Sequence, residues 1–165
     1  MKTIELIRKS LDGAKMWLTA LLQDVKSAPL TPPTPKGGNH PLWIVGHLAF
    51  SEARIVSQYI VGQGSPFAQW EPLFGRGSQP TPDASKYPSM DELLAELEKV
   101  RTRTLEVLGS MTDEDLSKPS KAPADRAALF GTVGQCFTML SHHMTFHAGQ
   151  VADARKAMGK TPVFG

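Results

Sequence analysis

The sequence predicts an all-α protein, folded as a four-helix bundle with a long crossover connection between the second and third helices. Apolar residues recur at alternating three- and four-residue steps in four long stretches, which is the pattern of amphipathic helices. Segments rich in proline and glycine separate these stretches, and no stretch shows the sustained alternation of a strand. Because 165 residues can bury a full-sized core, we expect a single domain over residues 1–165.

The first helix is predicted over residues 3–26. Its apolar stripe consists of Ile4, Ile7, Leu11, Ala14, Leu18, Leu21 and Val25. The stripe ends at Ala28-Pro29, since proline disfavours a helical conformation in the residue before it. Residues 29–38, PLTPPTPKGG, hold four prolines and two glycines and must form a connection.

The second helix is predicted to begin at Asn39 and to stop near Gly62. Asparagine is a favoured N-cap, and Pro41 falls in the first turn, where its missing N–H costs no hydrogen bond. Because glycine has no Cβ, we expect another part of the chain to approach closely at Gly46 in this helix and at Gly149 in the last helix. The irregular residues 63–88 are long enough to carry the chain back along the bundle, in which case the second and third helices run parallel, and they can also cover one end of the bundle.

The third and fourth helices have clear start signals. Ser89 with Glu92, and Thr132 with Gln135, have the spacing of capping boxes. Thr112 begins a predicted short helical turn, and residues 117–125 are predicted to be loop. The fourth helix spans residues 131–158 and ends at Gly159. Its apolar stripe includes Val133, Cys136, Leu140, His143, His147, Val151, Ala154 and Met158.

Two histidines of the fourth helix, His143 and His147, occupy stripe positions that leucine or valine would take in an ordinary core. They are one helical turn apart and project from one face, so they can hold a single metal ion. His47 lies about 12 Å along the second helix, and His147 lies about 17 Å before the end of the fourth. If these helices are antiparallel neighbours, the three rings fall at similar heights. Hydrogen-bonded core or surface histidines are the alternative.

Three segments of the sequence resemble the DinB-like (DinB/YfiT) family. They are GHLAFSE at 46–52 with NHPLW at 39–43, HMTFHAGQ at 143–150, and GKTPVF at 159–164. The resemblance implies an up-down-down-up bundle and a divalent metal held by His47, His143 and His147. Zinc or nickel is the usual ion, with manganese or iron as other choices. Ala148 departs from the family, since many relatives have arginine there.

Other polar residues near these motifs have weaker assignments. Gln150, one turn beyond His147, could touch a metal-bound water or hold a ring, and Glu52 could give an outer contact to the metal site. Ordinary hydrogen bonding or exposure is the alternative for both. Cys136 is too far from His143 to share its ion and is predicted to be a buried structural thiol. No residue is assigned as catalytic.

The first functional hypothesis is a metal-dependent enzyme. Three neutral imidazoles leave the ion its charge and open positions, so it can activate a bound thiol or water. Relatives of the DinB-like family include thiol-dependent S-transferases and isomerases that use a low-molecular-weight thiol, and suspected hydrolases. Because no general base lies near the triad in sequence, thiol activation is favoured over hydrolysis. The alternatives are a non-catalytic metal-binding or stress-response module, with a homodimer formed through a bundle face, and a bundle that has lost its metal.

Composition excludes several classes of partner. The formal net charge is +2 and the charged residues are scattered, which argues against nucleic-acid binding. No stretch is long and apolar enough for a membrane span. The start of the chain lacks a signal peptide and there is one cysteine, so a cytoplasmic protein is expected. Under the enzyme hypothesis, the expected partner is a small-molecule substrate.

Overall fold

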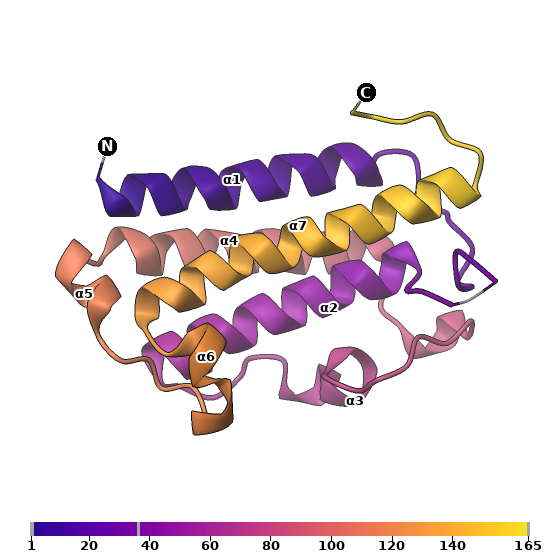
Figure 1. The fold of residues 1–165 in the computed structure, drawn as a ribbon. Helices are drawn as coiled ribbons and strands as arrows, with labels where there is room; N and C mark the ends of the chain where they lie inside the picture. Colours follow the sequence, from indigo (N-terminus) through magenta and orange to yellow (C-terminus); the bar gives the residue numbers. More distant parts are fainter. Residues whose placement is uncertain (1, 36, 165) are drawn as a thin grey trace.

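The computed structural model describes residues 2–35 and 37–164, and this part of the chain is helical without a β-strand (Figure 1). Four long helices form the predicted bundle in up-down-down-up order: α1 (Thr3–Leu22), α2 (Pro41–Arg54), α4 (Met90–Gly109) and α7 (Val133–Ala157). The predicted fold class is therefore confirmed. Helices α2 and α4 run parallel, whereas α2 and α7 are antiparallel (Figure 1).

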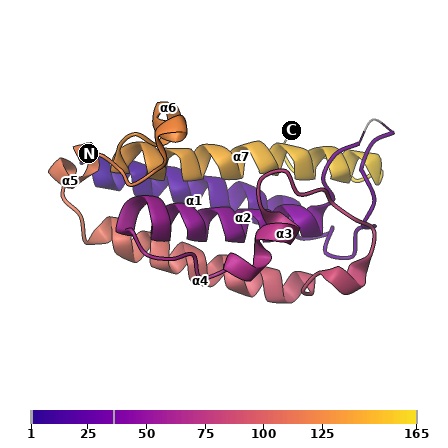
Figure 2. The ribbon, with the colours of Figure 1, turned by 90° about the horizontal axis from the view of Figure 1, so that it is seen from below.

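Helix α1 packs against α7, and α2 packs against α4 and α7. Figure 2 shows the same arrangement from below, with α2 between α4 and α7. The core has two parts along the bundle. One contains Trp43, Phe50 and Met144, and the other surrounds Phe130 and Phe137. The antiparallel contact of α2 with α7 is the one that the three histidines require.

The start signals of the helices are confirmed with one exception. Capping boxes are formed at Ser89, at Thr112 before α5 (Asp113–Ser117), and at Thr132. The prediction that Asn39 caps α2 is wrong by one residue. The cap is His40, whose Nδ1 accepts a hydrogen bond from the Trp43 backbone N–H at 3.1 Å. Its Nε2–H donates to the Thr81 carbonyl at 3.2 Å, which fixes the tautomer that capping needs.

Two helix ends also differ from the prediction. Helix α1 stops at Leu22 rather than at residue 26, and Val25 still packs in the core from the turn that follows. Beyond α2 the chain widens into a π-helix, η1 (Ile55–Val61), before the left-handed Gly62. There the Lys121 N–H and ammonium donate to the carbonyls of Tyr59 and Val61, so these carbonyls find partners outside the helix.

The segment between η1 and α4 is largely irregular, as predicted, with the short helices η2 (Ala68–Trp70), α3 (Glu71–Phe74) and η3 (Ala84–Lys86). It lies beneath α2 (Figure 1). The predicted loop at residues 117–125 differs at its two ends, where Ser117 still belongs to α5 and η4 (Ala124–Arg126) begins, and α6 (Ala127–Phe130) follows beyond it. Phe74, at the end of α3, is fully buried under Gly46.

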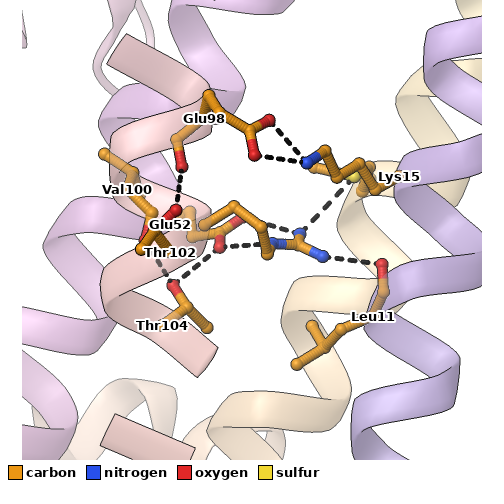
Figure 3. A network of polar contacts seen from close by, with 9 residues as sticks. Leu11, Lys15, Glu52, Glu98, Val100, Thr102 and Thr104 are labelled. Atoms are coloured by element: carbon orange, nitrogen blue, oxygen red, sulfur yellow. Dashed lines mark hydrogen bonds and ion pairs between the residues drawn. The ribbon is translucent and has the colours of Figure 1, made fainter. Parts of the chain in front are cut away.

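A buried polar network joins the long helices (Figure 3). The Arg101 guanidinium donates to both oxygens of Glu52 at 2.8 Å and to the Leu11 carbonyl at 2.6 Å. Thr104 donates to Glu52 at 2.7 Å, and the Met144 sulfur lies 3.5 Å from Arg101. Because Glu52 and Arg101 are 3% and 1% exposed, this network ties α1, α2, α4 and α7 together away from water.

We expect Gly46→Ala to destabilise the protein by about 1–3 kcal/mol, since it overpacks a rigid site. A Cβ at Gly46 would lie 2.3 Å from two ring carbons of Phe74. Gly149→Ala is the matched control: nothing lies within 4 Å of the Cβ position there, so the predicted close approach at Gly149 is wrong. The control should be neutral or stabilising, because alanine is a better helix former. Urea unfolding of both variants tests this, and equal midpoints would contradict it.

Candidate metal centre

The three predicted histidines converge from two helices. His47 Nε2 lies 3.1 Å from His143 Nε2, which lies 3.0 Å from His147 Nε2. All three nitrogens lie within 4.8 Å of one another. Zinc–nitrogen bonds of 2.0–2.1 Å in a tetrahedral site place two nitrogen ligands about 3.3 Å apart. The spacing of the rings therefore suits one divalent ion.

Hydrogen bonds on the far side of two rings decide where their lone pairs point. His47 Nδ1–H donates to the Phe74 carbonyl at 2.7 Å, and His147 Nδ1–H donates to Gln150 Oε1 at 2.9 Å. In the neutral rings, both Nε2 atoms are then acceptors that face His143. A single N–H on His143 cannot satisfy two acceptors equally, whereas a cation can. This donor set fits a metal ion.

Aromatic packing holds the ring of His47 in place. The Trp43 indole stacks on it, with ring centroids 4.6 Å apart and an interplanar angle of 9°. The indole is fixed in turn by a hydrogen bond from Nε1 to the Leu73 carbonyl at 2.9 Å. Thus the chain around α3, through Leu73 and Phe74, orients the ring of His47 from two sides.

Burial keeps the three imidazoles neutral. It lowers the pKa of His143 to about 3, with further lowering from the charges of His147, His47 and Arg54. Burial and the neighbouring His47 lower the pKa of His147 to about 4, against the opposing effect of Gln150. Burial also lowers the pKa of His47. Neutral imidazole is the form that binds metal, so little proton competition is expected at neutral pH.

These pKa values predict that the metal-free protein loses stability in mild acid. In the unfolded chain these histidines have a pKa of about 6.5. Below that pH the unfolded chain binds protons at His143 and His147 that the native protein does not bind. The free energy of unfolding therefore has its full value above pH 6.5. It decreases as the pH falls towards the native pKa values of about 4 for His147 and about 3 for His143. Urea unfolding in chelator from pH 7 to pH 4 measures this. The double variant His143→Leu/His147→Leu should lose less stability over that range, and an unchanged slope would contradict the prediction.

Gln150 lies where it can hold a ligand ring. Its Oε1 accepts from His147, and it also accepts from Asn39 Nδ2 at 3.1 Å. Asn39, expected as a helix cap, thus serves as an outer contact that links the start of α2 to α7. Nothing in the local pattern around Asn39 distinguishes this role from capping.

We expect Gln150→Leu to weaken metal affinity by about 10–100-fold, because outer contacts fix the tautomer and orientation of a ligand. The exposed Gln63, which lies away from the triad, provides the control Gln63→Leu. Competition with a coloured chelator measures both affinities. Equal affinities for the two variants would show that Gln150 does not orient His147.

A cavity of about 290 Å³ opens beside the triad. Its lining includes His47 and His143 and the three arginines Arg54, Arg76 and Arg126. Two of the three prospective ligands therefore border a space that a small molecule can occupy. The sequence predicted the histidines, but nothing in the charge pattern linked the three arginines, which come from separate segments.

Comparison with known protein families agrees with this geometry. The family model described as the DinB superfamily matches residues 10–151. The chain belongs to the DinB superfamily. The matched range contains all three triad histidines of this DinB protein and the whole of α2 and α4. No curated protein matches the sequence significantly.

Two other residues of this DinB protein are placed away from the triad. The expectation that Glu52 gives an outer contact to the metal site is wrong, since its carboxylate is engaged by Arg101 and Thr104. Glu52 is five residues from His47 and therefore points to another side of α2. Cys136 is buried as predicted, and burial raises the pKa of its thiol to about 11.

Ala148 is 2% exposed, so the position where many DinB relatives have arginine is here an apolar part of the core. The described part of the chain contains no helix that is both long and apolar enough to cross a membrane.

Proposed function

We propose that this DinB protein is a metal-dependent enzyme that binds zinc or nickel through His47, His143 and His147 and activates a thiol. The observation that carries the proposal is the convergence of three Nε2 atoms, two of which point their lone pairs at the third ring. A divalent ion held there would lower the pKa of a thiol or water and polarise a carbonyl.

The residues around the triad each have a separate task in this proposal. Phe74 and Gln150 hold ring N–H groups and so keep the ligand tautomers. Trp43 covers one face of His47 and excludes water from it. The cavity beside His47 and His143 would give a small molecule access to the ion.

Two features of the cavity support a thiol-dependent transferase over the alternatives. A non-catalytic metal-binding module, as a monomer or a homodimer, needs no open space beside its ligands, whereas this cavity borders two of them. A hydrolase usually needs a general base, and among the described residues no aspartate or glutamate lines the cavity. Activation of a thiol needs only a place for the thiolate near the ion.

Protein purified without an affinity tag, loaded with zinc or nickel, should turn over a chlorinated aromatic electrophile with one member of a thiol panel. The panel includes glutathione, bacillithiol, mycothiol and cysteine. The rate should vanish on chelation and return when the metal is restored. Turnover of an ester or amide without any thiol would favour the hydrolase instead. Metal binding without a rate in either assay would favour the non-catalytic module.

A further inference from the structure

We propose that the cavity beside the triad binds an organic anion, and that the substrate enters with a carboxylate or phosphate group held by Arg54, Arg76 and Arg126. The inference rests on the proposed function for the direction of binding, since the reacting part of the substrate would face His47 and His143. The anion site itself rests on the arginines and on the cavity they line.

The first argument is charge. Arg54 ends α2, Arg76 follows α3 and Arg126 ends η4, so the fold gathers three guanidinium groups from distant segments. The two carboxylates near them are poor partners: Glu71 lies 3.3 Å from Arg54 and is 60% exposed, and Asp125 lies 3.8 Å from Arg126 and is 75% exposed. Such exposed pairs neutralise little. The cavity therefore keeps a positive field that attracts anions.

The second argument is an unsatisfied donor. Among the described residues, Arg54 Nε is the one buried side-chain nitrogen or oxygen without a hydrogen-bond partner. The guanidinium also lies over the Phe50 ring, 5.4 Å from its centroid. The buried Nε shows that the protein itself leaves Arg54 short of acceptors, and its terminal N–H groups have the 3.3 Å contact with the exposed Glu71. Guanidinium groups bind carboxylate and phosphate oxygens through paired N–H donors, so an anion in the cavity can accept from these terminal groups.

The third argument is size and shape. The rest of the lining is largely apolar, with Ile55, Leu129, Phe130 and Met139 beside Ser51 and Tyr59. Its volume of about 290 Å³ is at the lower end of small-molecule sites. An anionic group with a compact apolar body fits this mixture, whereas a peptide or nucleic-acid strand would need a longer groove.

Calorimetric titration of the full chain tests the anion site directly. The probes are glutarate and phenyl phosphate, with the neutral glutaramide as a matched control. Glutarate or phenyl phosphate should bind, glutaramide should not, and the tighter probe identifies the preferred group. Arg54→Gln and Arg126→Gln should each weaken binding by about tenfold or more, since each removes a charge-assisted contact. Arg103→Gln should not, because Arg103 is exposed on α4 and does not line the cavity.

Anion titrations in the presence of a chelator distinguish anion binding from metal binding. Anion binding that survives His143→Ala and chelation but falls in the arginine variants supports the proposal, even if the protein takes up no metal and the proposed function fails. Equal binding by wild type and the arginine variants overturns it, as does binding that disappears only with the metal. If Arg54→Gln does not fold, Arg126→Gln and Arg76→Gln, both in short surface segments, decide the outcome.

Discussion

The variant Arg101→Met loses about 3–5 kcal/mol of unfolding free energy, because it leaves the Glu52 carboxylate buried without its partner. Arg101 spans both oxygens of Glu52 and the Leu11 carbonyl, and the pair is almost completely buried. Thr104 supplies one remaining hydrogen bond to Glu52, which cannot replace a bidentate guanidinium. Urea unfolding measured by circular dichroism at neutral pH gives the size of the loss.

Two further variants make this first prediction specific. Arg103→Met, on the exposed side of α4, removes the same type of side chain and should change stability by less than about 0.5 kcal/mol. The double variant Glu52→Leu/Arg101→Met should recover part of the loss, because an apolar pair replaces an ion pair. A double variant less stable than Arg101→Met, or a loss in Arg103→Met equal to that in Arg101→Met, would contradict the interpretation.

Replacing any one triad histidine by alanine should weaken metal affinity by at least about 100-fold, which is more than the loss of an outer contact costs. The effect should be similar for His47, His143 and His147, since their Nε2 atoms face a common point. Metal analysis of dialysed protein and competition with a coloured chelator measure occupancy and affinity. Metal should raise the melting temperature of the wild type but not that of the three triad variants.

The neighbouring histidine provides a matched control for this second prediction. His142 is exposed and adjacent to His143, but it points to a different side of α7. His142→Ala should therefore keep full occupancy and the full melting shift. Unchanged occupancy in His143→Ala, or equal losses in His142→Ala and His143→Ala, would rule out the triad as the binding site.

Local patterns predicted most of the fold. The apolar repeats of the four long helices and the capping boxes at Ser89 and Thr132 depend on residues at most one turn apart. The meeting of His47 with His143 was also predictable, because helix direction and residue spacing set the heights of the rings. The length of residues 63–88 allows the parallel course of α2 and α4, and the resemblance to the DinB-like family implied the up-down-down-up order in which α7 is antiparallel to α2.

Interactions between distant segments were not predictable in this way. For Glu52 the sequence left both an outer contact to the metal site and ordinary hydrogen bonding open, because its partner Arg101 comes from α4. His40 replaced Asn39 as the cap because Thr81, far along the chain, fixes its tautomer. The arginines of the cavity likewise come from three segments. These contacts depend on side-chain positions that the apolar pattern does not specify.

The placement of two prospective ligands on α7 has a consequence for biosynthesis. His143 and His147 leave the ribosome after α1, α2 and α4, and α7 is also the helix that covers α1. A nascent chain that ends before α7 therefore has one of the three prospective ligands, His47, and an uncovered apolar face. High-affinity metal binding therefore requires α7 to be synthesised and packed. A molecule that binds the ion tightly is then one in which all four long helices are in place.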